Sequence, residues 1–286
     1  MAYAHTHENG GAPHVHEGER QPHTHEDIPA PGNESASGHC NHPSELHHPK
    51  HHEGETPIMR FEDFCFAYDD EATLRHIDLS IYAGESVVLM GYNGSGKSTL
   101  LKAMSGLVFP QQGAYYFDGQ RVDERSMRDA AFAKRLHARV GFIFQDSDAQ
   151  LFCSNVEDEI AFGPRQMGLT EAEITQRVDD VCALLDIDKL RKRAPYHLSG
   201  GEKKKVAIAC ILSMNPDVYC FDEPLNGLDV KTRDWLYGFL HTLAESGKTL
   251  VIATHDQSLA DALADYFVYM GDTHEYSDLP HVHINR

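Results

Sequence analysis

The 286-residue sequence predicts an α/β fold built around a parallel β-sheet and preceded by a disordered tail. An apolar strand at residues 86–90 runs directly into a glycine-rich turn and then into an apolar helical segment. Two further apolar strands, at 217–223 and 249–253, also lead into polar residues. Residues 1–56, by contrast, hold twelve of the twenty histidines and few apolar side chains. We therefore expect a folded domain at residues 57–286 in which strands and helices alternate.

The tail is built from a repeat. Residues 5–31 form three tandem nine-residue units, each with a His-x-His-Glu start and a terminal proline. Prolines and glycines interrupt helix and strand alike, and the segment has too little apolar surface to offset its ordering entropy. Disorder is therefore the prediction for residues 1–56.

The paired histidines of the tail predict metal binding. Histidines two residues apart lie on the same side of an extended chain, and imidazoles beside carboxylates are ligands for borderline divalent metals. The alternatives are an inert acidic linker and an expression tag, although a periodic spacing mixed with Glu and Pro is not typical of a tag. The tail is expected to bind Ni²⁺, Co²⁺ or Zn²⁺ through these candidate ligands: His5, His7, His14, His16, His23 and His25.

Composition excludes several classes of protein. The net charge of −19 argues against a nucleic-acid partner, because affinity for phosphate backbones depends on Lys and Arg. No run approaches the about 18–20 apolar residues of a membrane span, and the N-terminus lacks a secretory signal. The six cysteines are scattered without a CxxC pair, so we expect reduced thiols in a cytosolic protein.

Two β-rich stretches, 58–68 and 74–82, precede the strand at 86–90 and its glycine-rich turn. The turn reads Gly-x-x-x-x-Gly-Lys-Ser, whose glycines let backbone N–H groups surround a β-phosphate at a helix N-terminus. Lys97 is expected to reach the β- and γ-phosphates, and Ser98 to ligate Mg²⁺. The candidate nucleotide-binding residues are Gly91, Asn93, Gly94, Ser95, Gly96, Lys97, Ser98 and Thr99.

The strands at 217–223 and 249–253 bring two acids and a histidine to the same sheet edge. The first ends in Asp222 and Glu223, which predicts a ligand for Mg²⁺ and a base for an attacking water. The second is followed by His255. Because the carboxyl ends of parallel strands lie at one edge, we expect all three side chains beside the phosphate-binding turn.

Residues 198–202, Leu-Ser-Gly-Gly-Glu, predict a second anion-binding turn, followed by an amphipathic helix at 203–213. A Ser-Gly-Gly turn that opens a helix offers backbone N–H groups to an anion. One nucleotide does not need two such turns in one subunit. The second turn is therefore expected to face the phosphates bound by another copy.

This combination resembles the ATP-binding cassette family, whose signature reads LSGGQ; Glu202 replaces the glutamine here. The resemblance covers residues 58 to about 270. It implies a P-loop NTPase cassette with a parallel-sheet core, an antiparallel β subdomain and a helical subdomain. It also implies an ATPase that holds ATP and Mg²⁺ between two cassettes. We expect a homodimer, because both half-sites are complete in this chain, and a heterodimer is the alternative.

The resemblance also implies roles for single residues. Tyr68 resembles the aromatic residue that stacks on adenine, with Phe64 and Phe66 as alternatives. Gln145 resembles the glutamine that touches Mg²⁺ and senses the membrane partner, and His255 resembles the switch histidine that holds the γ-phosphate. The residues implied at the interface between two cassettes are Ser199, Gly200, Gly201 and Asp229.

Residues 146–152, an acidic helical stretch at 156–161 and the sequence Phe-Gly-Pro at 162–164 resemble the energy-coupling-factor importers. In that group the segment forms a groove for the coupling helices of a transmembrane subunit; ordinary core packing of Leu151, Phe152 and Phe162 is the alternative. Nickel and cobalt importer ATPases are the nearest resemblance, which implies metal uptake driven from the cytoplasmic face of the cell membrane. The competing functions are vitamin uptake, a soluble cassette protein and a metal store.

Overall fold

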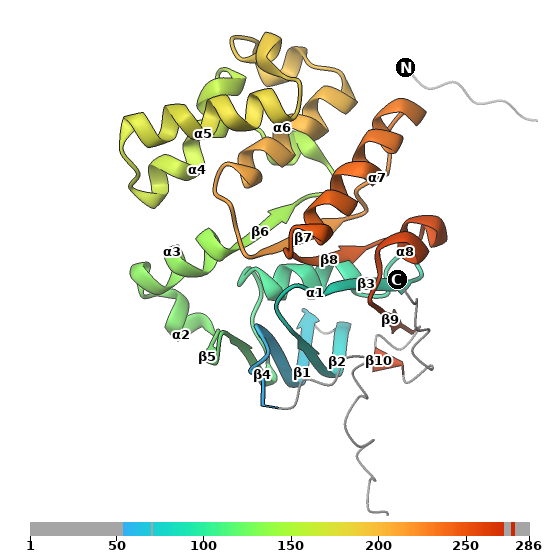
Figure 1. Cartoon of the computed structure of the whole chain (residues 1–286). Helices are drawn as coiled ribbons and strands as arrows, with labels where there is room; N and C mark the ends of the chain where they lie inside the picture. Colours follow the sequence, from blue (N-terminus) through green and yellow to red (C-terminus); the bar gives the residue numbers. More distant parts are fainter. Residues whose placement is uncertain (1–53, 70, 272–275, 278–286) are drawn as a thin grey trace, which may run out of the picture. The chain divides into compact units, whose positions relative to one another are not determined.

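The computed structural model describes residues 54–69, 71–271 and 276–277. Residues 1–53 of the predicted metal-binding tail, including its six candidate histidines, lie outside the described residues. The first of two sheets is antiparallel, with the strand order β2-β1-β4-β5 (Figure 1). Its strands are β1 (Met59–Tyr68), β2 (Glu71–Ile81), β4 (Gln112–Phe117) and β5 (Gln120–Arg121).

The second sheet has six strands in the order β10-β9-β3-β8-β7-β6. The five strands from β9 to β6 are parallel, and β10 pairs antiparallel to β9. The strands are β3 (Ser86–Gly91), β6 (Val140–Ile143), β7 (Val218–Asp222), β8 (Thr249–Ala253), β9 (Tyr266–Met270) and β10 (Tyr276–Ser277).

The parallel sheet is buried on both faces, which explains why its strands are continuous apolar runs. In β7, Tyr219 and Phe221 belong to one core, whereas Val218 and Cys220 belong to the other. The first core contains side chains from α4 to α8, and the second contains α1 and the antiparallel sheet. Helices therefore cover one face, and α1 with the first sheet covers the other.

Eight α-helices lie in the described part of the chain, and each is too short or too polar to cross a lipid bilayer. Helix α1 begins inside the glycine-rich turn, while α4, α5 and α6 pack together next to β6 (Figure 1). The helices are α1 (Lys97–Met104), α2 (Glu124–Met127), α3 (Ala130–Arg139), α4 (Val156–Met167), α5 (Glu171–Leu184), α6 (Gly200–Leu212), α7 (Val230–Glu245) and α8 (Gln257–Leu263).

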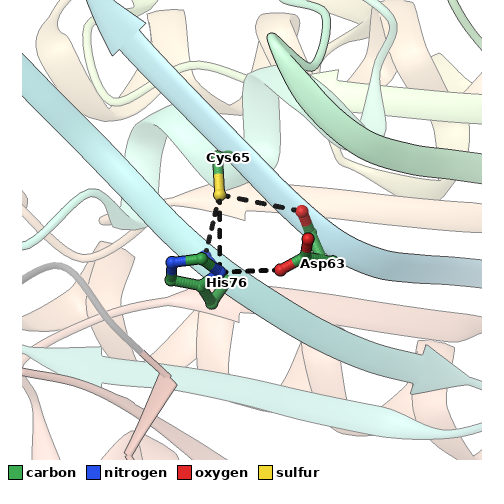
Figure 2. A group of neighbouring side chains, drawn as sticks. All are labelled: Asp63, Cys65 and His76. Atoms are coloured by element: carbon green, nitrogen blue, oxygen red, sulfur yellow. Dashed lines mark hydrogen bonds and ion pairs between the residues drawn. The ribbon is translucent and has the colours of Figure 1, made fainter. Parts of the chain in front are cut away.

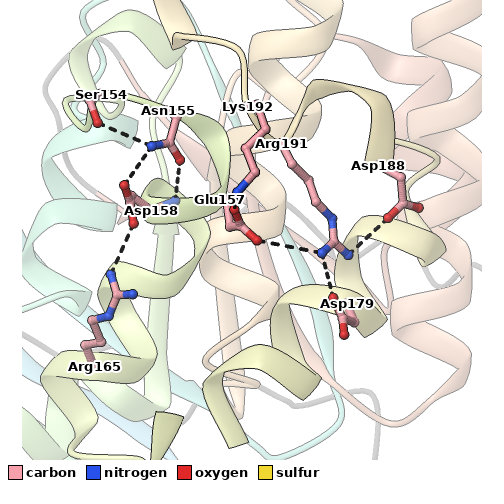
Figure 3. Close-up of polar contacts among 9 residues, drawn as sticks. All are labelled: Ser154, Asn155, Glu157, Asp158, Arg165, Asp179, Asp188, Arg191 and Lys192. Carbon is pink, nitrogen blue, oxygen red and sulfur yellow. Dashed lines mark hydrogen bonds and ion pairs between the residues drawn. The ribbon is translucent and has the colours of Figure 1, made fainter. Parts of the chain in front are cut away.

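An ion-pair network centred on Arg191 connects the start of α4 to α5 (Figure 3). The Arg191 guanidinium lies 2.6 Å from Asp179 Oδ1, 3.0 Å from Asp188 Oδ1 and 3.9 Å from Glu157 Oε1. Lys192 also pairs with Glu157, whose backbone N–H donates to the Arg191 carbonyl oxygen over 3.0 Å. The network fixes α4 relative to the loop that leads to residues 198–202.

The structure confirms the predicted α/β class, with its parallel core, antiparallel sheet and helical group. The main difference in boundaries concerns α6, which was predicted at 203–213 but begins at Gly200. The reason is a capping box, in which the Ser199 side chain accepts the Glu202 N–H while the Glu202 side chain accepts the Ser199 N–H. The Ser-Gly-Gly turn is thereby the first turn of the helix.

A candidate nucleotide-binding and hydrolysis site

The loop between β3 and α1 is shaped by glycines with positive φ angles. Gly91, Gly94 and Gly96 have φ values of 149°, 87° and 95°. A Cβ atom at Gly91 would lie 2.5 Å from the Met270 carbonyl oxygen, and one at Gly96 would lie 2.8 Å from the Thr73 carbonyl oxygen. Only glycine fits at these two positions, because the loop is packed closely between β9 and the start of β2.

Lys97 is buried at the base of this loop. Its Nζ donates to the carbonyl oxygens of Gly91, over 2.7 Å, and Tyr92, over 3.0 Å. Burial lowers the pKa of Lys97, and the nearby carboxylates of Glu223 and Asp222 oppose that shift. The ammonium group is thus held in place by carbonyl oxygens of its own loop.

Ser98 on α1 and Asp222 on β7 place two oxygen atoms that could ligate a metal ion next to each other. The Ser98 hydroxyl donates to Asp222 Oδ1 over 2.9 Å. Burial raises the pKa of Asp222, the Ser98 hydrogen bond opposes this, and Glu223 adds to it. A hydroxyl, a carboxylate and the side-chain amide of Gln145, which lines the same cavity, fit the oxygen ligands that Mg²⁺ prefers.

Glu223 lies directly after β7 in a left-handed conformation with φ of 42°, and its N–H donates to the Ala253 carbonyl oxygen. Such strain in a non-glycine residue is typical of functional sites. Glu223 Oε2 lies 2.9 Å from His255 Nδ1. The other oxygen, Oε1, is buried and has no hydrogen-bond partner among the described residues. A buried acceptor of this kind is suited to hold a water molecule or a ligand.

These side chains meet around one cavity of about 440 Å³. It contains residues from the glycine-rich loop together with Glu223 and His255, whereas Asp222 does not line it and contacts it through Ser98. Thr73 and Asn226 also line it, and neither was identified from the sequence. The lining residues are Thr73, Asn93, Gly94, Gly96, Lys97, Ser98, Thr99, Gln145, Glu223, Asn226 and His255.

The second predicted set lies around a different cavity of about 560 Å³, lined by Ser199, Gly201 and Asp229 among others. None of these three lines the first cavity. Asp229 begins α7 by accepting the N–H of Thr232 over 3.0 Å and its hydroxyl over 2.8 Å, and these bonds lower the pKa of Asp229. One chain therefore does not bring the two sets together.

The predicted adenine contact, Tyr68, is 42% exposed at the end of β1 and packs edge-to-face on Phe66, with ring centroids 4.8 Å apart. It does not line the first cavity. Phe64 is fully buried in the core and Phe66 is half-buried against it. Of the three aromatic residues, Tyr68 has the ring most available for stacking, and its role stays a prediction.

Lys204 is a site residue that the sequence analysis missed. It is buried on α6, and its Nζ donates to the carbonyl oxygens of Phe144, over 3.1 Å, and Gln145, over 3.0 Å. Burial lowers the pKa of Lys204 to about 8. The only sequence signal was a lysine on the otherwise apolar face of an amphipathic helix. Its contacts hold the segment that carries Gln145.

An apolar groove of about 480 Å³ lies next to this segment. Phe152 is 67% exposed and Phe162 is 42% exposed, and their rings meet edge-to-face at 5.0 Å. Ordinary core packing therefore does not describe these two residues, whereas Leu151 is half-buried against the core. The carboxylate of buried Glu159 fixes the groove's edge by accepting the N–H groups of Phe152 and Cys153.

Comparisons with known proteins agree with this geometry. Residues 74–226 match the sequence profile of the family described as ABC transporter. This chain belongs to the ABC transporter family. It is an ABC ATPase that hydrolyses ATP for transport, and the cassette implies ATP as substrate and Mg²⁺ as cofactor. Within the family, it is similar to nickel import and energy-coupling-factor ATP-binding proteins.

Three of these similarities are informative. The nickel import ATP-binding protein LarO of Lactiplantibacillus plantarum is 42% identical over 76% of this chain and 90% of its own length. The structure of cbiO1 from Clostridium perfringens, part of the ABC transporter complex cbiONQ, is 33% identical, with a TM-score of 0.68 over 78% of this chain and 88% of that one. A dimeric ATP-binding cassette in a post-hydrolysis state, bound to ADP and Pi, is 25% identical, with a TM-score of 0.71 over 80% of this chain and 100% of that one.

Proposed function

We propose that this cassette is the ATP-hydrolysing subunit of an energy-coupling-factor importer that takes up a divalent metal ion, Ni²⁺ or Co²⁺. It would act as a peripheral protein on the cytoplasmic face of the cell membrane. The observation that carries the hydrolytic part is the meeting of Lys97, Ser98 and Glu223 at one cavity, with Asp222 hydrogen-bonded to Ser98 beside it. The transport part is supported by the exposed groove and by the family of the chain.

In this proposal each group at the cavity has one task. The loop N–H groups and Lys97 hold the β- and γ-phosphates and stabilise the charge that develops in the transition state. Ser98, Asp222 and Gln145 would hold Mg²⁺, which supplies further neutralisation of phosphate charge when it is bound. Glu223 accepts the proton of the attacking water, for which its unpaired Oε1 is available, and His255 holds the γ-phosphate.

The second cavity serves a second copy. Ser199, Gly200 and Gly201 open α6, whose N-terminal N–H groups are suited to bind an anion. We place them against the nucleotide held by the partner's loop, with Asp229 at the interface between the two cassettes. The dimeric cassette that resembles this chain supports the arrangement. Glu202 adds a carboxylate beside Ser199, and its pKa is lowered mainly by the backbone N–H of Ser199, so it remains ionised there.

The groove around Phe152 and Phe162 is where we place the coupling helices of the transmembrane subunits. Exposed aromatic side chains in a concave apolar surface are typical of protein interfaces. The relative cbiO1 is described as part of a transporter complex, which supports such a partner. This assignment distinguishes the importer from a soluble cassette protein, which has no membrane partner to dock.

The cargo assignment is supported by the similarity to LarO, a nickel import ATP-binding protein, and by the histidine repeat of the tail. We propose that the tail binds Ni²⁺, Co²⁺ or Zn²⁺ in the cytosol and buffers the imported metal. Vitamin uptake with an incidental metal-binding tail is the alternative cargo assignment.

The test of the importer is capture of the full chain from detergent-solubilised native membranes, followed by identification of the co-purifying proteins. We expect two or more multi-span membrane proteins, and an ATPase activity in that complex that depends on Ni²⁺ or Co²⁺. Phe152→Asp should abolish the capture, whereas Leu107→Asp, which changes an exposed leucine outside the groove, should not. Recovery of cytosolic proteins alone would contradict the proposal.

The tail is tested separately in the full chain by replacing the six paired histidines with glutamine. We expect the number of Ni²⁺ ions bound per chain to fall while basal ATPase activity stays unchanged, because none of the replaced residues is among those that line the nucleotide cavity. An unchanged stoichiometry in equilibrium dialysis would refute metal binding by the repeat.

A further inference from the structure

Three potential metal ligands lie together on the antiparallel sheet (Figure 2), and none of them lines the nucleotide cavity. They are Asp63 and Cys65 from β1 and His76 from β2, and their donor atoms all lie within 4.8 Å of one another. We propose that this group is a binding site for one borderline divalent transition-metal ion, such as Co²⁺, Ni²⁺ or Zn²⁺. The proposal goes beyond the cargo assignment and does not depend on it.

The distances fit a single ion. Metal–ligand bonds of about 2.0–2.3 Å at tetrahedral angles separate two ligand atoms by about 3.3–3.7 Å. His76 Nδ1 lies 2.7 Å from Asp63 Oδ1 and 3.9 Å from Cys65 Sγ, so one nitrogen faces both other donors. Small side-chain rotations would bring the three atoms to ligand separations. Binding would replace the His76–Asp63 hydrogen bond and release the proton of the Cys65 thiol.

Irregular strand pairing produces this grouping. Asp63 and His76 have φ angles of 46° and 48°, and the β1–β2 register shifts on both sides of Phe64. On a regular strand, residues 74 and 76 would share one face. Here Leu74 is buried, whereas the His76 side chain is 62% exposed. Bulges often turn side chains in this way next to functional sites.

The surroundings hold Asp63 in position. Gln112 Nε2 donates to Asp63 Oδ2 over 2.6 Å, leaving Oδ1 toward His76. The Asp63 N–H donates to Asp78 Oδ1 over 2.8 Å. A Cβ atom at Gly113 would lie 2.1 Å from the Asp63 carbonyl oxygen. Only glycine at position 113 therefore allows β4 to approach the bulge this closely. Gln112 is thus an outer partner that orients a metal-binding carboxylate.

The donor set selects the class of metal. A thiolate, an imidazole and a carboxylate suit borderline ions, whereas Mg²⁺ and Ca²⁺ prefer oxygen ligands alone. Three protein ligands leave a coordination position for water or for an exchanging ligand. Because Asp63 and His76 are about half exposed, a metal ion can reach the site from solvent. These properties describe an exchangeable cytosolic site rather than a closed structural one.

The test is titration of the full chain with Co²⁺, using the near-ultraviolet thiolate-to-cobalt charge-transfer band. Cys65→Ser and His76→Ala should eliminate the band, and Gln112→Ala should weaken Co²⁺ binding by about 10-fold or more. Cys40→Ser, which removes the cysteine of the tail, should retain it, as should His241→Ala, which changes an exposed histidine paired with Glu245. The tail variant with six glutamines should also retain the band, which separates this proposal from metal binding by the repeat.

A second measurement needs no variant. In the wild-type chain, Zn²⁺ should slow alkylation of Cys65 by iodoacetamide at least 10-fold, while alkylation of half-buried Cys153 stays unchanged. Retention of the cobalt band in Cys65→Ser, or equal alkylation of Cys65 with and without Zn²⁺, would show that the three residues form a hydrogen-bonded cluster only and would overturn the proposal.

Discussion

Replacing Glu223 with glutamine tests the assignment of the catalytic base most directly. The change removes the group that accepts a proton and keeps the size and shape of the side chain. Glu223 Oε2 lies 2.9 Å from His255 Nδ1, and the glutamine amide can retain a hydrogen bond there. The variant should therefore keep the architecture of the cavity while losing proton transfer.

The expected magnitude has two parts. General base catalysis contributes about 10²- to 10⁴-fold to a rate. This corresponds to about 2.7–5.4 kcal/mol of activation free energy at about 1.36 kcal/mol per tenfold change. Folding stability should stay within about 1 kcal/mol, because buried Glu223 Oε1 has no hydrogen-bond partner in the described part of the chain that the substitution could remove.

The assay is single-turnover hydrolysis of γ-labelled ATP with saturating Mg²⁺, combined with size-exclusion chromatography in ATP. Glu223→Gln should bind ATP and accumulate as a dimer, because the step that separates the two cassettes is blocked. The matched control is Glu85→Gln, which changes another buried glutamate at the opposite end of the parallel sheet and should leave turnover within about twofold.

Turnover by Glu223→Gln within tenfold of the wild-type rate would refute the base assignment. A loss of ATP binding by Glu223→Gln would refute a different step of the reasoning, namely that the glutamine preserves the cavity.

Three further predictions concern the loop, the buried lysine and the groove. Lys97→Ala should weaken ATP binding by about 10- to 100-fold in a fluorescence titration, because a charge-assisted contact contributes about 1.5–3 kcal/mol; unchanged affinity would contradict its placement at the phosphates. Burial lowers the pKa of Lys204 from 10.5 to about 8. Between pH 8 and pH 10.5 the folded chain therefore binds fewer protons than the unfolded chain, and the free energy of unfolding increases as the pH rises. The free energy of unfolding of Lys204→Met, measured in urea relative to the wild type, should therefore fall across that window, and a flat difference would be inconsistent with a buried ammonium. Phe152→Asp should leave basal ATPase activity and the unfolding midpoint unchanged, since the side chain is mostly exposed, and a large destabilisation would indicate core packing.

The sequence predicted that the glycine-rich loop, Glu223 and His255 gather at one cavity, because the signals for these residues are local. Lys97 and Ser98 follow a strand in a motif whose spacing determines the loop, and Asp222 and His255 follow strands whose parallel pairing brings them to one edge. A helix after the Ser-Gly-Gly turn was also predicted, but its start was placed three residues late, because the capping-box spacing of Ser199 and Glu202 was not recognised.

The rest depends on contacts between distant segments. Thr73 lines the cavity because Gly96 packs against the start of β2, and no local pattern indicates that approach. Little in the local sequence distinguishes Lys204 from an ordinary surface lysine. Its role depends on the packing of α6, which brings its Nζ to the carbonyl oxygens of Phe144 and Gln145. The grouping of Cys65 with His76 depends on a shift in the pairing register of β1 and β2. A prediction that assumes regular alternation of side chains between the two faces of a strand does not include such a shift.

Helix α6 links the groove, the cavity and the dimer-facing turn through one set of contacts. At its start, Ser199 opens the helix at the second cavity, and Lys203 pairs with Asp148 at 2.5 Å. Lys204 holds the carbonyl group of Gln145, while Gln150 Nε2 donates to the Ala207 carbonyl oxygen over 3.2 Å. The segment from Gln145 to the groove is therefore fastened to two turns of the same helix. If a membrane partner docks in the groove as proposed, a displacement of this segment would either move Gln145 and Ser199 together or break these bonds, so these contacts are the ones that would couple docking to the cavity.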